Sequence, residues 1–268
     1  MNNSNEEFSP HLNPLPKGEK KIIAVCGKGG AGKTSISASI IRQLLRNPAG
    51  KVLAIDADPA VGLATSLGVA VVRTVDDIRN DLVARLEKGG NQDRKTILSN
   101  LDYEIFEAVK ERGGLAFLAI GRPEREGCYC KVNELLREII GTLAGNFDHV
   151  IIDGEAGIEQ VNRRVLERVT HVLLVSDASQ KGLNVVKTAL DVARKAIKFQ
   201  KAGLILNRIR GQAEVEKLLI PEGMELLGWL PENDKIREAD IQGSNFLDIP
   251  PTPFHEALRG CLEKFGII

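Results

Sequence analysis

Apolar and polar positions follow two alternating patterns from Lys21 to the end of the chain. Short, nearly continuous apolar runs predict strands, at residues 21–26, 52–55, 115–120, 149–152, 172–175, 203–206 and 226–228. Segments in which apolar residues recur every three or four positions predict helices, at residues 33–46, 132–143, 159–168, 182–197, 235–240 and 254–264. Apolar strands separated by helices are typical of a parallel sheet that helices cover on both faces. The pattern therefore predicts an α/β fold with a doubly wound, mostly parallel sheet.

Two segments depart from this alternation. Residues 1–20 contain three prolines and almost no periodicity, and we expect them to form a mobile N-terminal tail. Residues 73–113 include most of the stretches TVDDIRNDLVARLEKGG and LDYEIFEAVKERGG, which predict a helical insertion between strands. Residues 21–268 as a whole are expected to form a single domain.

The composition limits the classes of function. Hydrophobic residues make up 43% and charged residues 27% of the 268 positions, which is typical of a globular protein with one large core. Lys plus Arg and Asp plus Glu each number 36, so no excess charge favours a nucleic acid or an anionic membrane as a partner. No apolar run approaches the roughly 20 residues of a membrane-spanning helix, and the first twenty residues lack the apolar core of a secretory signal. Four scattered cysteines do not make a disulfide framework, and we expect a cytoplasmic protein.

The stretch KIIAVCGKGGAGKTSISASII carries the strongest motif in the chain. Gly27 to Thr34 satisfy G-x-x-x-x-G-K-[ST] between a predicted strand and a predicted helix, which is the context that a phosphate-binding loop requires. Glycines allow the backbone N–H groups to face phosphate oxygens at the helix N-terminus. Lys33 is expected to reach the β- and γ-phosphates, and the Thr34 hydroxyl to bind Mg²⁺. The nucleotide-binding residues expected here are Gly27, Lys28, Gly29, Gly30, Ala31, Gly32, Lys33, Thr34 and Ser35.

Acidic residues end two further predicted strands. In HVIIDGEAGIEQ the strand ends at Asp153, which is the pattern of the acidic strand end that holds Mg²⁺, here through water. Asp56 and Asp58 follow the predicted strand 52–55, at the carboxyl edge where ligands bind in open α/β sheets. The alternative for each residue is structural, as a helix cap for Asp153 and as a turn cap for the other two.

The loop contains a second lysine, Lys28, and KGGAGKT resembles the deviant phosphate-binding loop of one family of P-loop ATPases. That family includes the MinD cell-division ATPases, the arsenite-pump ATPases and the nitrogenase iron protein. The resemblance implies that Lys28 crosses a dimer interface to the partner's nucleotide, where a cation stabilises the charge that develops on phosphate. It therefore implies a nucleotide-dependent homodimer. The alternative is a solvated loop lysine.

The same resemblance implies roles beyond the loop. Asp58 would orient the attacking water, and Asp56 would support the Mg²⁺ shell or the loop. Gly157 falls at the position of a glycine that senses the γ-phosphate. Asn207, at the end of LILN, would contact the adenine edge, with a plain strand-end role as the alternative, and Pro231 in LGWLPEND would close over the base. ATP as the nucleotide rests on the resemblance, and the implied catalytic residues are Lys28, Lys33 and Asp58.

A cysteine pair precedes the predicted helix 132–143. In EGCYCKVNELL, Cys128 and Cys130 lie at or just before the N-terminus of that helix, whose positive end favours thiolates, the form that binds soft or borderline metals. Two cysteines do not complete a tetrahedral site, and a two-fold axis that supplies one pair from each subunit is the simplest way to reach four sulfur ligands. The alternatives are a strained disulfide and two packed structural thiols.

Around this pair, GRPEREGCYCKVNELLR with the later DGEAGIEQVNRR resembles the CooC-type nickel-insertion ATPases of carbon monoxide dehydrogenase and acetyl-CoA synthase maturation. The resemblance covers residues 21–268. It implies that Cys128 and Cys130 bind Ni²⁺ or Zn²⁺, or an iron–sulfur cluster, between two subunits. It also implies that ATP hydrolysis drives delivery of the metal, with nickel favoured, to a client metalloenzyme.

Two other functions stay open. An ATP-dependent iron–sulfur reductase like the nitrogenase iron protein would need a further cysteine after Asp153, and DGEAGIEQVNRRVLERV has none, although two C-x-C pairs could still hold a cluster. A membrane-positioning ATPase of the MinD type would need a basic amphipathic C-terminal helix. The segment 254–265 has an apolar stripe, but its polar face mixes both charges, which favours a docked core helix.

Overall fold

The computed structural model describes residues 20–46, 50–88, 100–122, 130–154, 165–166 and 168–268. Residues 1–19 of the predicted tail, the glycine at position 157 and Cys128 lie outside these residues. Within them, no helix is long and apolar enough to cross a membrane.

An eight-stranded sheet forms the centre of the molecule, in the order β3-β4-β2-β5-β1-β6-β7-β8. All neighbouring strands are parallel except β3, which pairs antiparallel with β4. The sheet confirms the predicted mostly parallel α/β fold. Its strands are β1 Lys21–Gly27, β2 Val52–Asp56, β3 Lys110–Arg112, β4 Leu115–Ala119, β5 His149–Asp153, β6 His171–Ser176, β7 Lys201–Ile209 and β8 Glu225–Pro231.

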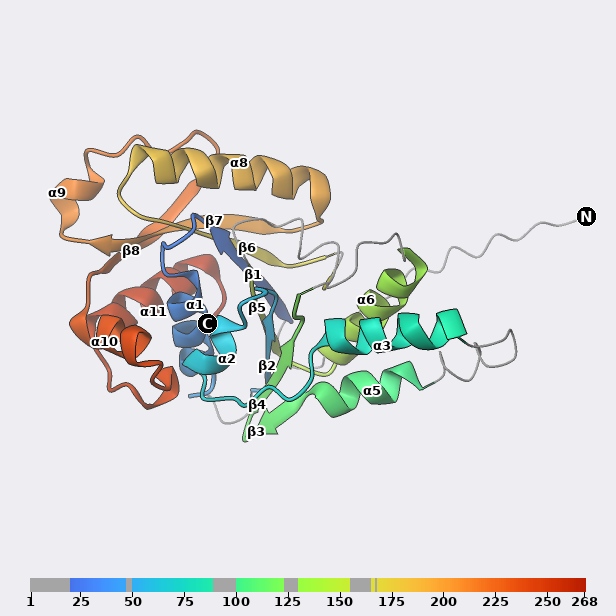
Figure 1. Ribbon diagram of the computed structural model, residues 1–268. Coiled ribbons are helices and arrows are strands. Elements are labelled where there is room, and N and C mark those ends of the chain that lie inside the picture. Colours follow the sequence, from blue (N-terminus) through green and yellow to red (C-terminus); the bar gives the residue numbers. More distant parts are fainter. Residues whose placement is uncertain (1–19, 47–49, 89–99, 123–129, 155–164, 167) are drawn as a thin grey trace, which may run out of the picture.

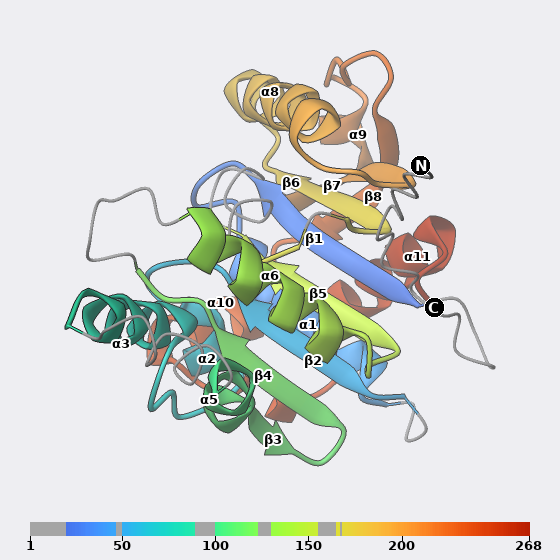
Figure 2. The same ribbon diagram turned by 90° about the vertical axis from the view of Figure 1, so that its right-hand side faces the viewer.

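Helices cover both faces of the sheet, as Figures 1 and 2 show. Along β1, Ile22 and Ala24 belong to a core that contains residues of α3, α5, α6 and α8, whereas Ile23 and Val25 belong to a core that contains residues of α1, α2, α10 and α11. This alternation of side chains along one buried strand explains its continuous apolar sequence. The helices are α1 Lys33–Leu44, α2 Gly62–Ser66, α3 Val75–Lys88, α5 Leu101–Ala108, α6 Cys130–Ala144, α8 Gln180–Ala196, α9 Gln212–Val215, α10 Asp234–Gln242, the 3₁₀ helix η1 Phe246–Asp248, and α11 Pro253–Phe265.

All seven predicted strands are present, and each predicted helix that lies within the described residues is present within a few positions. Inside the segment 73–113, predicted as a helical insertion, α3 and α5 are helical, and residues 110–112 form the edge strand β3, which was not predicted. Three charged residues, Lys110, Glu111 and Arg112, carry no apolar signal, and the pairing with β4 determines their conformation. Most of the predicted helix 159–168 lies outside the described residues, and Arg168 forms an isolated bridge with Lys198.

The carboxyl ends of the parallel strands lie at one edge of the sheet. The chain adds β2, β4 and β5 on one side of β1 and β6, β7 and β8 on the other side. The change of direction beside β1 is the place where ligands bind in open α/β sheets. The register pairs Asp56 with Asp153, so β2 and β5 end side by side in two aspartates. The candidate site is at this edge.

Candidate functional site

The segment between β1 and α1 has a backbone that requires glycine. Gly27 and Gly32 have φ angles of 139° and 87°, in the left-handed region that side chains disfavour. A Cβ atom on Gly27 would lie 2.1 Å from the Val175 carbonyl oxygen of the neighbouring strand. The chain therefore leaves β1 tightly against β6 and turns directly into the N-terminus of α1, where backbone N–H groups and the helix dipole favour an anion.

Lys33, the first residue of α1, points back over this loop. Its Nζ donates a hydrogen bond of 3.3 Å to the carbonyl oxygen of Lys28. The lysine thus spans the concave side of the loop and brings a positive charge to the helix N-terminus. An anion held there would meet both the ammonium group and the backbone amides, which fits a phosphate group.

Lys28 makes an ion pair with Asp177, which follows β6. The Ser179 hydroxyl donates to the other oxygen of that carboxylate at 2.6 Å and also caps α8 by accepting from the Gly182 amide. Partial burial raises the pKa of Asp177, but the hydrogen bonds from Lys28 and Ser179 outweigh this effect, so the net shift is downward. In this structure Lys28 is therefore held by its own chain.

Asp153 ends β5 beneath the loop and is 1% exposed. The Ser37 hydroxyl donates to its Oδ1 at 2.8 Å, and the Thr34 side chain is a further hydrogen-bond partner. Burial raises the pKa of Asp153 to about 6, against the opposing effect of these hydroxyls and of Lys33. A buried carboxylate beside the Thr34 hydroxyl offers oxygen ligands of the kind that Mg²⁺ prefers. These residues fit a magnesium ion at the phosphate site.

Asp56 ends β2 beside Asp153 but turns toward a different partner. Its Oδ2 accepts hydrogen bonds from the amides of Leu63 and Ala64, at 2.9 and 3.4 Å, and its Oδ1 accepts from the Asp58 amide at 3.1 Å. Burial, together with the Asp153 carboxylate, raises the pKa of Asp56 to about 7. Both oxygens of Asp56 therefore hold the backbone of the segment that leads into α2, which supports the predicted loop-supporting role over direct metal binding.

Asp58 lies in that segment and is only partly buried. Its Oδ1 accepts from the Ala60 amide at 2.9 Å, which closes a local turn. Its charge is close enough to contribute to the raised pKa of Asp153. The structure thus brings Asp58 to the same edge as Lys33 and Asp153, and its catalytic role stays a prediction.

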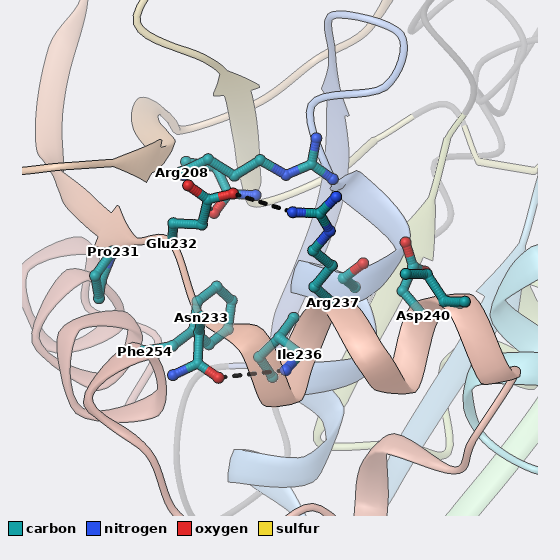
Figure 3. Close-up of a pocket in the computed structure, with 11 residues that line it drawn as sticks. Arg208, Pro231, Glu232, Asn233, Ile236, Arg237, Asp240 and Phe254 are labelled. Carbon is teal, nitrogen blue, oxygen red and sulfur yellow. Dashed lines mark hydrogen bonds and ion pairs between the residues drawn. The ribbon is translucent and has the colours of Figure 1, made fainter.

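A pocket of about 420 Å³ lies next to α1, between the ends of β7 and β8 and helix α10 (Figure 3). Asn207 and Pro231, predicted to contact a base, both line it. The Asn207 amide is already engaged, because its Nδ2 donates to the Ala31 carbonyl at 2.8 Å and its Oδ1 accepts from the Arg208 amide at 3.0 Å. A contact between the Asn207 side chain and adenine would add to, or replace, the hydrogen bond from Asn207 to the Ala31 carbonyl.

Several lining residues were not predicted from the sequence: Arg208, Glu232, Asn233, Ile236, Arg237, Asp240 and Phe254. The Asn233 side chain accepts from the Ile236 amide at 3.2 Å and caps α10, and Glu232 lies 4.0 Å from Arg237 (Figure 3). The sequence PENDKI could have indicated this cap, because an asparagine just before the first apolar residue of a helix is typical of an N-cap.

The cysteine pair lies only partly within the described residues, because α6 begins at Cys130. Since β4 and β5 are both parallel to β2, α6 runs back across the sheet and begins at the carboxyl edge. Figure 2 shows its first turn at the edge where β2 ends. In the described part of the chain, no group of three or more His, Cys, Asp and Glu side chains is arranged to hold a metal ion. Burial raises the pKa of the Cys261 thiol to about 11, which disfavours the thiolate that metals require.

Comparison with known proteins adds a family to this geometry. Residues 22–246 match the family described as the CobQ/CobB/MinD/ParA nucleotide binding domain. An ATP-binding protein of Methanocaldococcus jannaschii is 37% identical over 232 residues, which span 85% of this chain and 91% of the relative. The carbon monoxide dehydrogenase accessory protein CooC of Rhodospirillum rubrum is 28% identical over 268 residues, which span 91% of this chain and 97% of CooC.

Solved structures share the fold. The septum site-determining protein MinD of Pyrococcus horikoshii, solved with Mg-ADP, superposes with a TM-score of 0.61 over 92% of this chain and 96% of MinD, at 22% identity. The MinD cell division protein of Aquifex aeolicus superposes with a TM-score of 0.64 at 21% identity, over 92% of this chain and 96% of that chain. These likenesses confirm the predicted MinD-like type of α/β fold.

Proposed function

Because the chain belongs to the CobQ/CobB/MinD/ParA family of nucleotide-binding P-loop proteins, we propose that it is an ATP-hydrolysing metallochaperone. It binds a metal ion, with nickel favoured, and delivers it to a client metalloenzyme such as carbon monoxide dehydrogenase or acetyl-CoA synthase. The proposal places the protein in the cytoplasm, where thiols stay reduced. The similarity to CooC along 91% of the chain supports this proposal.

The nucleotide part of the proposal rests on the loop and its two neighbours. ATP binds with its β- and γ-phosphates at the N-terminus of α1, where Lys33 already spans the loop. Thr34 and, through water, Asp153 would hold Mg²⁺; the Asp153 carboxylate lies within hydrogen-bond reach of the α1 hydroxyls. The ion neutralises charge on the phosphates. Asp58 orients the attacking water from the segment after β2.

The active form in this proposal is a homodimer. Lys28 leaves Asp177 and reaches the nucleotide of the second copy, where its ammonium group stabilises the charge of the transition state. The ion pair in the single chain holds the partly exposed Lys28 side chain at the carboxyl edge. Exchange of one anionic partner for another leaves the lysine paired in both states, which limits the electrostatic cost of the change.

The metal is the cargo of the reaction, and Cys128 and Cys130 are its proposed ligands. One pair from each copy supplies four sulfur atoms, which is a complete set for Ni²⁺ or Zn²⁺. The observation that carries this part is the position of Cys130 at the start of α6, on the edge of the sheet that also holds the phosphate loop. ATP turnover changes the metal affinity if the closed and open dimers bind the ion with different strength.

The test is a Cys130→Ala variant purified without oxygen, compared with wild type for metal content and for ATP hydrolysis. We expect the variant to keep its rate of ATP hydrolysis and to lose stoichiometric metal. Cys261→Ala is the matched control, because Cys261 is buried against β8, in the core on the face of the sheet opposite to the core that α6 joins. Unchanged metal content in Cys130→Ala would rule out the assignment of Cys130 as a metal ligand. Iron together with inorganic sulfide in the wild-type protein would show a resident iron–sulfur cluster and would contradict the delivery of nickel.

A further inference from the structure

Strand β7 contains a bulge at the edge of the candidate site. Leu206 pairs with Trp229 and Ile209 pairs with Pro231, so Asn207 and Arg208 together oppose the single residue Leu230. Arg208 has a φ angle of 62°, a left-handed conformation that is uncommon for a residue with a side chain. Bulges of this kind occur next to active sites, where they redirect side chains.

The bulge lets two consecutive residues reach the same loop. In a regular strand their side chains would point to opposite faces. Here the Asn207 Nδ2 donates to the Ala31 carbonyl at 2.8 Å, and the Arg208 Nη1 donates to the Gly30 carbonyl at 3.1 Å. The second guanidinium nitrogen lies 4.0 Å from the point where a Cβ on Gly32 would be. The guanidinium of Arg208 therefore lies across the phosphate-binding loop.

In this arrangement the charged guanidinium of Arg208 makes only a weak interaction. Among the described residues its partner is a neutral carbonyl, and Glu232, an acidic residue that lines the pocket, is directed to Arg237 (Figure 3). Hydrogen bonds from a guanidinium to phosphate oxygens are shorter and about twice as strong as bonds to neutral acceptors. The side chain is exposed, so it is free to turn a few ångströms from the loop backbone to an anion bound by that loop.

Arg208 also lies between the two parts of the site. Arg208 lines the same pocket as Asn207 and Pro231, and its guanidinium lies over Gly30 and Gly32. A nucleotide that fills both parts must place the phosphates nearest the sugar at this boundary. This position suits a cation that recognises phosphate rather than the base.

We propose that Arg208 is a positioning residue for the nucleotide: on binding, its guanidinium leaves the Gly30 carbonyl and pairs with the phosphate group nearest the sugar. The inference rests on the proposed nucleotide site and adds to it a residue from β7, two strands away from β1 in the sheet. It also predicts that the bulge is required, because a regular β7 would direct Arg208 away from the loop.

The test compares the affinities for ADP and for adenosine, measured by displacement of a fluorescent ADP analogue. Arg208→Gln keeps a long side chain and the same backbone demand but removes the charge. We expect this substitution to lower the affinity for ADP by about 10-fold and to leave the affinity for adenosine unchanged. Arg208→Lys is expected to recover part of the affinity for ADP, because it restores a cation without the planar fork.

Arg210→Gln is the matched control, since Arg210 is an exposed arginine two residues further on whose amide is bound to Glu214 outside the pocket. It is expected to bind ADP like wild type. Equal losses for adenosine and ADP in Arg208→Gln would assign the residue to the base and overturn the proposal, as would an unchanged affinity for ADP. Failure of the wild type to bind ADP would instead remove the proposed nucleotide site itself.

Discussion

Strands β2 and β5 end side by side in Asp56 and Asp153, yet the two carboxylates have different partners. Asp56 accepts three hydrogen bonds, all from backbone amides. Asp153 accepts from hydroxyl groups on α1. A backbone amide at the start of a helix has no acceptor within the helix and a fixed direction, so it depends on a side-chain acceptor. A hydroxyl group can rotate and donate to another acceptor. From this difference we predict that Asp56 acts as a structural acceptor and that Asp153 binds the metal or a metal-bound water.

The largest expected effect separates the two residues by activity. Asp153→Asn removes the charge that would hold Mg²⁺ and keeps the shape of the side chain. We expect ATP hydrolysis to fall by on the order of 100-fold, with a melting temperature near that of wild type, because burial already disfavours this charge. Hydrolysis rates at saturating Mg²⁺, with melting curves on the same samples, check this. Retained hydrolysis would remove Asp153 from the magnesium site.

The second effect separates them by stability. Asp56→Ala leaves the Leu63 and Ala64 amides without their acceptor, and we expect the free energy of unfolding to fall by about 2 kcal/mol. Asp56→Asn keeps an oxygen acceptor and is the control, expected to cost less than about 1 kcal/mol. Urea unfolding of the three proteins measures both. If Asp56→Ala unfolds like wild type but loses Mg²⁺-dependent hydrolysis, Asp56 is a ligand and the comparison fails.

The third effect is a dependence on pH in the absence of Mg²⁺ and nucleotide. Burial raises the pKa of Asp56 to about 7 and that of Asp153 to about 6, whereas the pKa of an aspartate in an unfolded chain is about 3.9. Between these limits the folded chain holds more protons, so these two groups make the free energy of unfolding fall as pH rises from about 4 to about 7. The difference between wild type and Asp153→Asn isolates the contribution of Asp153. A difference that does not change with pH would contradict the raised pKa.

The smallest effect concerns the hydroxyl that holds Asp153. Ser37→Ala removes the donor at 2.8 Å, and we expect a loss of about 1 kcal/mol in stability, together with a further rise in the pKa of Asp153. Ser39→Ala is the matched control, because Ser39 is equally buried on α1 but donates to the Ser35 carbonyl of its own helix. Urea unfolding at pH 7.5 and a pH series compare the two variants. Equal pH dependence in both would show that Ser37 does not control the carboxylate.

Much of this site could be predicted from local sequence. The motif that ends in Lys33 and Thr34 predicts the phosphate-binding loop. The apolar strand that ends in Asp153 predicts the acidic residue beside that loop. Partners that depend on tertiary packing could not be predicted. The Lys28–Asp177 ion pair joins residues 149 positions apart, and a bulge in β7 directs Arg208 to the loop. That bulge arises from the pairing of β7 with β8, and this pairing cannot be predicted from the sequence of β7 alone.

The fold shows the same division. Six central strands are continuous apolar runs and were predicted, as was the half-buried edge strand β8. Edge strand β3 consists of three charged residues that pair with β4, and short α2 depends on Asp56 as its acceptor. Elements that a neighbour stabilises, rather than their own apolar pattern, are the ones that the sequence did not reveal.

The proposed function requires that the nucleotide at the phosphate loop controls metal binding at Cys128 and Cys130. The most direct measurement is the Ni²⁺ affinity of the anaerobic protein with a non-hydrolysable ATP analogue and with ADP, both in the presence of Mg²⁺. We predict affinities that differ by about 10-fold or more, and a difference that disappears in Asp153→Asn. Equal Ni²⁺ affinities in the two nucleotide states of the wild type would contradict the claim.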